Sequence, residues 1–241
     1  MSVENEVKMV LTPNFNAKAL KGWDLKKIRQ GYLGNTAHLI REDKKHFLVY
    51  RDWAGTDRHE LEIRLPVKKE DFEALWTTCT DKSARDYYQG TSVSKIEVGR
   101  LPKTPRIREY GNDYFFTYKD WVTGQDERIE IEDRITEKAF QDLWPNCSDT
   151  MNKDRYVMKK DKIEWVVDFM REGNDPQGDI YFVLAEAEMP EGMDKPKKIV
   201  PEIKGDVIFE VPKTDKDYSS RKLCDESYAA QKLKDIGYTP R

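Results

Sequence analysis

One segment of the chain occurs twice. Residues 27–94 and 95–162 match at an offset of 68 positions, from Lys27 and Lys95 at one end to Asp81 and Asp149 at the other. Two copies are too few for a repeat array, in which each unit packs against neighbours on both sides. We therefore expect an internal duplication inside a single domain that covers residues 1–241.

Each copy predicts several short strands followed by a helix. HFLVYRDW (46–53) and DYFFTYKDW (113–121) are rich in the aromatic and β-branched residues that favour strands. EDFEALW (70–76) and EKAFQDLW (137–144) place Phe, Leu and Trp at helical spacing, which predicts short amphipathic helices. The predicted fold class is α+β and mostly antiparallel.

Two short motifs set the alignment of the copies. Tyr50-Arg51-Asp52-Trp53 returns as Tyr118-Lys119-Asp120-Trp121 at the common offset. Ile40-Arg41-Glu42 returns as Ile107-Arg108-Glu109, which requires a slip of one residue. This alignment makes Arg41 the counterpart of Arg108.

Several predicted strands carry charge on one face. Side chains alternate along a strand, so positions i and i+2 share a face. The polar and charged positions grouped in this way are Glu4, Glu6 and Lys8; Arg106 and Arg108; Thr117 and Lys119; Arg128, Glu130 and Glu132; Glu164 and Asp168; and Glu186 and Glu188. One interpretation is an ordinary half-exposed sheet whose charged faces meet water.

The pairing of like charges favours a second interpretation. Two carboxylates at i and i+2, such as Glu186 and Glu188, repel each other unless a cation lies close by. Paired basic residues suit the binding of several phosphate oxygens. Triphosphate hydrolysis needs both, because carboxylates hold Mg²⁺ or Mn²⁺ and cations neutralise the phosphates. A sheet closed into an antiparallel β-barrel would point both sets inward around the ligand.

Composition argues against other classes of protein. A formal net charge of -3 lacks the basic excess of a general nucleic-acid binder, so no DNA partner is expected. No run approaches the roughly 18 apolar residues of a membrane span, and the N-terminus has no signal-peptide pattern. Cys79, Cys147 and Cys224 form no CxxC pair, which disfavours disulfides and thiolate zinc sites. We expect a soluble cytoplasmic protein without membrane association.

With these features in view, the chain resembles the CYTH, or triphosphate tunnel metalloenzyme, superfamily. Glu4-Asn5-Glu6-Val7-Lys8 matches its N-terminal ExExK signature, and KKIRQGYL (26–33) is similar to its second strand. Further segments follow in the family's order: RIR (106–108), TYK (117–119), RIEIE (128–132), DRY (154–156), EWVVDF (164–169) and LAEAEM (184–189). The resemblance spans nearly the whole chain apart from one copy of the repeat.

The resemblance implies an eight-stranded tunnel that hydrolyses inorganic tripolyphosphate or a nucleoside triphosphate with Mg²⁺ or Mn²⁺. It assigns the metal to Glu4, Glu6, Glu186 and Glu188. It assigns the triphosphate to Lys8, Arg106, Arg108, Lys119, Arg128 and Arg155. Asp168 and Glu130 or Glu132 would complete the metal and water shell, and with Lys8 they are the predicted catalytic residues. We expect a monomer or a homodimer.

The duplication departs from the family's pattern. In the first copy Leu39 and Arg41 stand for the paired arginines, Arg51 for Lys119, Glu60 for Arg128 and Arg64 for Glu132. We therefore expect the second copy to carry the site. Two alternatives stay open: an adenylate cyclase of the same superfamily, in which a ribose 3′-hydroxyl replaces water, and a non-catalytic protein that binds a nucleotide or polyphosphate.

Overall fold

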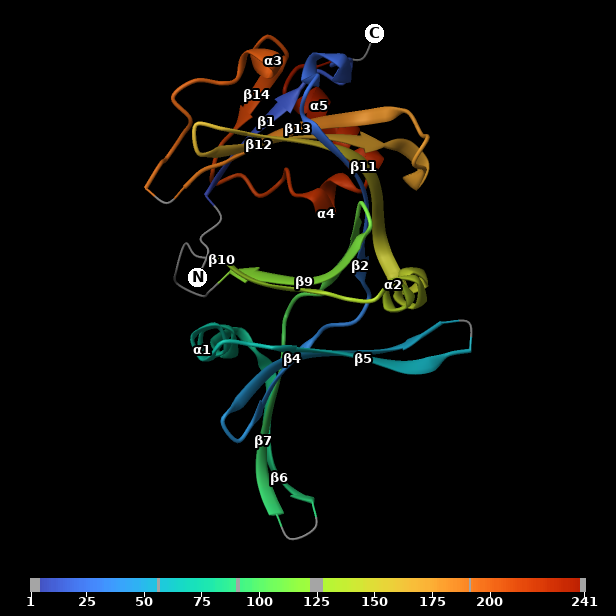
Figure 1. The fold of residues 1–241 in the computed structure, drawn as a ribbon, viewed down its shortest axis with the longest axis vertical. Coiled ribbons are helices and arrows are strands. Elements are labelled where there is room, and N and C mark those ends of the chain that lie inside the picture. The colour runs from blue at the N-terminus through green and yellow to red at the C-terminus, as the bar shows by residue number, and fades with distance from the viewer. Residues whose placement is uncertain (1–4, 56, 90–91, 122–127, 191, 239–241) are drawn as a thin grey trace. The chain divides into compact units, whose positions relative to one another are not determined.

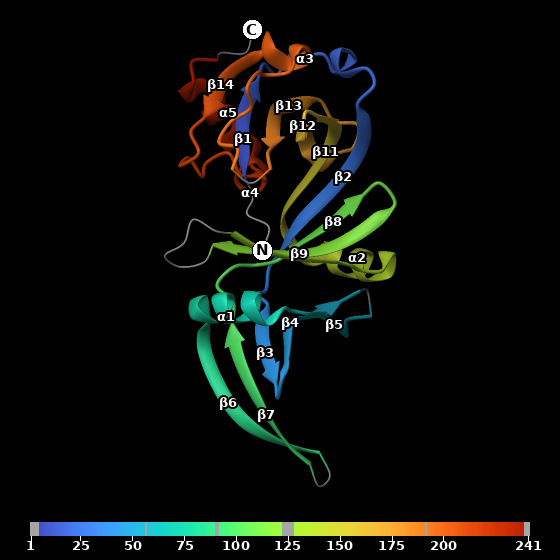
Figure 2. The same cartoon turned by 60° about the vertical axis from the view of Figure 1, so that its left-hand side comes forward.

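The computed structural model describes residues 5–55, 57–89, 92–121, 128–190 and 192–238, and for 85–89, 92–94, 121 and 128 it describes the backbone alone. The fold is α+β with large antiparallel sheets, which confirms the predicted class (Figures 1 and 2). The described chain divides into two compact units. Unit 1 comprises residues 31–108 and 112–148, and unit 2 comprises residues 5–30, 109–111 and 149–238.

Unit 1 contains most of the duplicated segment. Its elements are β3 (His38–Glu42), β4 (Lys45–Ala54), β5 (His59–Pro66), α1 (Lys69–Thr78), β6 (Thr80–Gln89), β7 (Ser92–Arg100), β8 (Arg106–Tyr110, whose last two residues belong to unit 2), β9 (Asp113–Trp121), β10 (Arg128–Arg134), α2 (Glu137–Leu143) and the 3-10 turn η2 (Trp144–Asn146). The two helices occur where the Phe, Leu and Trp spacing predicts them.

Unit 2 contains the remaining elements. They are β1 (Glu6–Leu11), η1 (Ala17–Leu20), β2 (Asp24–Leu33), β11 (Cys147–Lys160), β12 (Ile163–Arg171), η3 (Glu172–Asn174), β13 (Ile180–Glu188), α3 (Pro201–Lys204), β14 (Val207–Val211), α4 (Ser220–Leu223) and α5 (Glu226–Asp235). The end of β2 and the start of β11 belong to unit 1.

The duplication is visible in the order of the elements. β2, β3, β4, β5, α1 and β6 are followed by a second series, β7, β8, β9, β10, α2 and β11, of the same types. One sheet has the strand order β5-β4-β3-β7-β6, and the other contains the run β10-β9-β8-β2-β11. In each run the first strand of one copy lies between two strands of the other copy. Neither copy therefore completes its sheet from its own residues.

The backbone hydrogen bonds correct the alignment of the copies around β3 and β8. The bonds that bracket the two strands occur in equivalent pairs: Leu101 N to Ala37 O (2.9 Å) with Leu33 N to Pro105 O (3.0 Å), and Asp43 N to Lys95 O (3.2 Å) with Gly111 N to Lys27 O (3.1 Å). The offset of 68 residues thus holds throughout, and the one-residue slip inferred from sequence is wrong. His38 and Ile40, rather than Leu39 and Arg41, are the counterparts of Arg106 and Arg108.

A single apolar core holds unit 1 together. Phe72 and Leu75 of α1 and Phe140 and Leu143 of α2 are fully buried in this core. Tyr50 and its counterpart Tyr118 are also buried here, and each donates a hydrogen bond to the aspartate two residues later. The repeated aromatic and aliphatic positions therefore serve packing in both copies.

The sheet of unit 2 has an apolar core on each face. One core joins Met9, Trp165 and Phe169 to Ile203 of α3. The other joins Val10, Met170 and Leu184 to residues of α4 and α5. Because residues two positions apart on a strand share a face, Lys8, Asp168 and Glu186 lie on the same face as Val10, Met170 and Leu184 of the second core. The rest of that face carries the charged residues described below.

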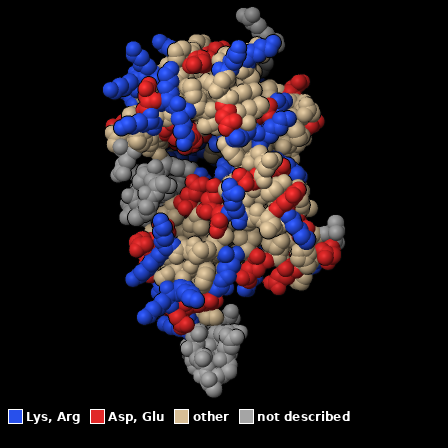
Figure 3. Space-filling view, in the orientation of Figure 1, with Lys and Arg blue, Asp and Glu red and all other residues tan. Residues whose placement is uncertain are grey.

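Acidic and basic side chains are interspersed over the surface visible in Figure 3, in keeping with the balanced charge of the sequence. Among the described residues, no helix combines the length and the apolar composition needed to cross a lipid bilayer.

Candidate functional site

The register of three strands in unit 2 brings its acidic residues into neighbouring positions. Glu6 of β1 pairs with Glu188 of β13, which pairs in turn with Glu164 of β12. Two residues farther along β1, Lys8 pairs with Glu186 of β13. Directly paired residues of antiparallel strands point to the same side of the sheet, so these charges share one face.

Three carboxylates converge on this face. One carboxylate oxygen from each of Glu6, Glu186 and Glu188 lies within 4.8 Å of the others. We call these three residues the acidic group. The ammonium of Lys8 lies 3.0 Å from Glu6 Oε1 and 3.1 Å from Glu186 Oε1, so one cation serves two of the three carboxylates. Burial alone would lower the pKa of Lys8, but Glu186 and Glu6 raise it above its usual value.

Glu188 lies at the exposed edge of the acidic group. No basic side chain of the described residues lies within ion-pair distance of its carboxylate. Partial withdrawal from water and the negative charges of Glu186 and Glu164 raise the pKa of Glu188 to about 7. The acidic group therefore carries repulsion that Lys8 does not relieve.

A second set of charges on the same face centres on Asp168. Arg155 donates two hydrogen bonds of 2.7 Å, one to each carboxylate oxygen of Asp168, and Lys153 Nζ lies 2.5 Å from Oδ2. Burial would raise the pKa of Asp168, but Arg155 and Lys153 hold it well below its usual value. Arg155 also approaches Glu186 at 3.6 Å, which links this set to the acidic group.

Lys153 is a site residue that the sequence analysis missed. Its side chain is only 2% exposed, and burial together with the charge of Arg155 lowers its pKa to about 8. The signal was present in the sequence, because Lys153 and Arg155 stand at i and i+2 on one strand, like the paired arginines of β8. Only Arg155, within DRY (154–156), was recognised.

The donor atoms of the acidic group fit a hard divalent cation. Mg²⁺ and Mn²⁺ prefer oxygen ligands, and all three residues offer carboxylate oxygens without a competing thiolate. The raised pKa of Glu188 is the kind of repulsion that a nearby cation would relieve. Lys8 contacts two of the same carboxylates, so a metal ion would compete with its ammonium.

The other predicted residues that the structure describes form a separate set in unit 1. Lys119 pairs with Glu130 across β9 and β10, with Nζ and Oε2 2.8 Å apart. Glu132 accepts a hydrogen bond of 2.6 Å from Thr117 and lies 3.0 Å from Arg108 Nη2. Arg106 is 3.9 Å from the same carboxylate. These residues form ion pairs within unit 1, and Arg106 and Arg108 share the one carboxylate of Glu132.

The predicted site residues thus fall into three classes. Unit 2 brings together Glu6, Lys8, Arg155, Asp168, Glu186 and Glu188. Unit 1 brings together Arg106, Arg108, Lys119, Glu130 and Glu132. Glu4 and the side chain of Arg128 lie outside the described part of the chain. Within unit 2, Asp168 contacts Arg155 and Lys153 rather than joining the three-carboxylate group.

Comparison with known proteins adds no relative. No protein-family model, no curated protein and no solved structure matches the chain.

Proposed function

We propose that the charged face of unit 2 binds a divalent metal ion and a triphosphate, and that the protein hydrolyses the triphosphate. The observation that carries this proposal is the convergence of Glu6, Glu186 and Glu188 within 4.8 Å. A structural role alone would pair each carboxylate with a base, yet Glu188 has none among the described residues while two cations crowd onto Asp168.

The chain's own residues would divide the work by charge. A divalent ion held by the acidic group would supply positive charge that offsets the negative charge developing on the phosphates. Lys8, whose ammonium lies beside Glu6 and Glu186, would bind a phosphate oxygen. Asp168 fixes the guanidinium of Arg155 and the ammonium of Lys153 through hydrogen bonds, so their positive charges are held in place before the ligand arrives.

The wider proposal comes from the sequence pattern. It includes Arg106, Arg108, Lys119 and Arg128 as further phosphate ligands, Glu4 as a fourth metal ligand, Glu130 or Glu132 in the metal and water shell, and closure of the strands into a tunnel. The described residues of this group in unit 1 form ion pairs with one another, which a purely structural role would also explain. Each assignment therefore needs a substitution of its own to test it.

Phosphate release tests the proposal. The substrates are tripolyphosphate, ATP and thiamine triphosphate, each with and without Mg²⁺ or Mn²⁺. We expect metal-dependent release of orthophosphate. Glu186→Gln should lose at least the roughly 10–100-fold that removal of an outer partner of a metal ligand costs. Calorimetric titration with Mn²⁺ should show the same loss as weaker metal binding.

A matched variant controls for the loss of one carboxylate. Glu62→Gln removes an acid of the first copy that pairs with Arg51 on unit 1, and it should leave turnover and Mn²⁺ binding unchanged. Pyrophosphate and cyclic AMP formed from ATP would identify the cyclase alternative. Tight tripolyphosphate binding without any product would identify the binding alternative. Full metal-dependent turnover by Glu186→Gln would disprove the site assignment.

A further inference from the structure

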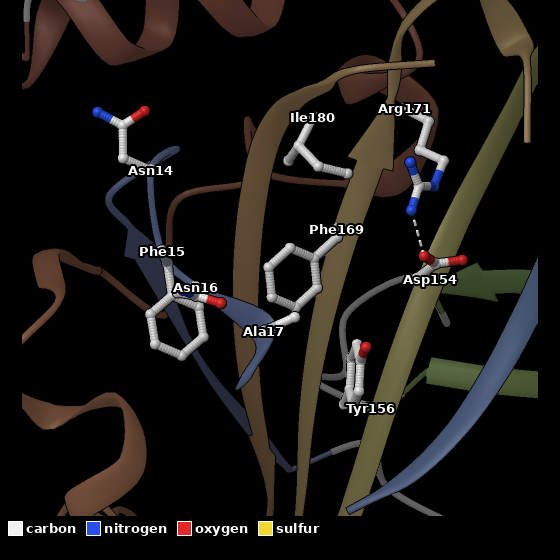
Figure 4. Close-up of a pocket in the computed structure, with 9 residues that line it drawn as sticks. All are labelled: Asn14, Phe15, Asn16, Ala17, Asp154, Tyr156, Phe169, Arg171 and Ile180. Carbon is white, nitrogen blue, oxygen red and sulfur yellow. Dashed lines mark hydrogen bonds and ion pairs between the residues drawn. The ribbon is translucent and has the colours of Figure 1, made fainter. Parts of the chain in front are cut away.

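Unit 2 contains a cavity on the face of β11 and β12 opposite to the charged residues. Its volume is about 370 Å³, at the lower end of the roughly 300–1,000 Å³ that is typical of small-molecule sites. The residues that line it come from the segment 14–17 and from β11, β12 and β13 (Figure 4). Asp154 and Tyr156 alternate with Arg155 along β11, so the cavity and the Asp168 set lie on opposite sides of the sheet.

Aromatic rings form one wall of the cavity. The ring of Phe169 is flanked by Phe15, nearly parallel at 5.8 Å between centroids, and by Tyr156, edge-on at 5.5 Å. Phe15 and Phe169 are buried in the apolar core behind the cavity, whereas Tyr156 is half-buried. This wall offers flat apolar surface, against which a planar ring packs well.

The rest of the lining offers hydrogen-bonding groups with little net charge. Arg171 donates hydrogen bonds to Asp154 and to the carbonyl of Gly178, so the one cation and the one anion offset each other. Within the described part of the chain, the buried Nε of Arg171 has no partner. The same holds, over those residues, for the amide of Asn14 and the hydroxyl of Tyr156. Donors and acceptors are therefore both available.

We propose that this cavity binds a planar, uncharged heteroaromatic ring whose edge carries both hydrogen-bond donors and acceptors, the chemistry of a nucleobase. A phosphate group would need a net positive lining, which the Arg171–Asp154 pair does not supply. A purely apolar ring would leave the polar groups of Asn14 and Tyr156 unpaired. The inference does not depend on the proposed hydrolysis, because it concerns the other face of the sheet.

Titration with phosphate-free nucleosides tests the inference. Adenosine, guanosine, cytidine and uridine are added to the full chain and followed by calorimetry and by NMR shifts. At least one nucleoside should bind with a Kd on the order of 1 mM or tighter. Tyr156→Ala should weaken it by at least about fivefold, the lower end of the contribution of base stacking. Asn14→Ala should weaken it as well.

Matched variants separate this cavity from other surfaces. Asn112→Ala removes an exposed amide from unit 1 and should not change the affinity. Glu186→Gln should not change it either, whether or not the charged face hydrolyses triphosphates. Absence of nucleoside binding at several millimolar would overturn the inference. So would indole binding as tightly as the best nucleoside, or a loss caused by Glu186→Gln but not by Asn14→Ala.

Discussion

The two copies of the repeat keep the same cross-strand ion pair and differ in what surrounds it. Arg51 and Glu62 are 2.6 Å apart across β4 and β5, and Lys119 and Glu130 are 2.8 Å apart at the equivalent place on β9 and β10. Arg106 and Arg108 of β8 have no basic pair as their counterpart in the first copy, because His38 and Ile40 occupy the equivalent positions. The duplication therefore preserved packing and one ion pair but not the density of basic groups.

The strands beyond each copy differ even more. β6, the last strand of the first copy, is the terminal strand in its sheet order. β11, its counterpart, is followed by β12, β13 and β1, which supply Asp168, Glu186 and Glu6. Sequence alone places Arg85 and Tyr87 where Lys153 and Arg155 stand in the second copy. The candidate site therefore combines acids from strands outside the repeat with cations from inside one copy.

Of the substitutions that distinguish the two copies, removal of the Asp168 carboxylate should cause the largest loss of stability. Asp168→Asn leaves the buried Lys153 without its counterion and removes both hydrogen bonds of Arg155 to the carboxylate, and breaking a buried pair in this way costs about 3–5 kcal/mol of the free energy of unfolding. Urea denaturation measures it. Glu62→Gln, which breaks the exposed pair of the first copy, should cost at most about 1 kcal/mol. Equal losses would mean that the second copy gains nothing from β12.

The ion pair that occurs in both copies, Arg51–Glu62 and Lys119–Glu130, allows a test of function with a smaller expected change in free energy. If Lys119 binds a phosphate, Lys119→Met should raise KM for tripolyphosphate about tenfold or more, because a hydrogen bond to a charged group contributes about 1.5–3 kcal/mol. Arg51→Met alters the matching residue of the first copy and should leave KM within a factor of about two. Steady-state kinetics at fixed Mg²⁺ measures both. An equal rise in the two variants would remove the functional distinction between the copies.

The sequence was sufficient to predict the general fold because its signals are local. The repeat, the α+β class and both helices follow from spacing within short segments, such as Phe140, Leu143 and Trp144. The paired charges of β1 and β13 follow from strand alternation in the same way. The approach of the Glu6, Glu186 and Glu188 carboxylates to within 4.8 Å depends on which strands pair. Spacing along the sequence does not specify that pairing, so the prediction of a shared site rested on the family resemblance.

The sequence could not specify the pairing between the copies. At the offset of 68, β2 and the segment 92–101 share only Lys27/Lys95, Ile28/Ile96, Gly31/Gly99 and Leu33/Leu101, and these four shared residues do not indicate which sheet each strand joins. The one-residue misalignment at Ile40 arose because both copies contain the sequence Ile-Arg-Glu near this point. The correct register is defined by the backbone hydrogen bonds of Ala37 and Pro105. The role of Asp168 was equally hidden, because its two cationic partners lie on another strand.

The carboxylate pair Glu130/Glu132 of unit 1 and the pair Glu186/Glu188 of unit 2 differ in their partners. This difference should change the free energy of unfolding less than the substitution of Asp168 does. Glu132 lies beside Arg108, whereas burial and the charges of Glu186 and Glu164 raise the pKa of Glu188 from 4.5 to about 7. Between these values the native state binds a proton that the unfolded state has released. The contribution of Glu188 to the free energy of unfolding should therefore fall as pH rises from 4.5 to 7, by less than the roughly 1.4 kcal/mol per pH unit of one full proton, because Glu188 is partly exposed.

Urea denaturation at pH 5, 6, 7 and 8 measures this slope. Glu188→Gln should flatten it, and Glu132→Gln should not. Saturating Mn²⁺ should reverse the trend in the wild-type protein, because metal binding requires the deprotonated carboxylate and so strengthens as pH rises. If Glu132→Gln changed the slope as much as Glu188→Gln does, the two pairs would be electrostatically alike, and the case for a cation at the acidic group would lose its main electrostatic support.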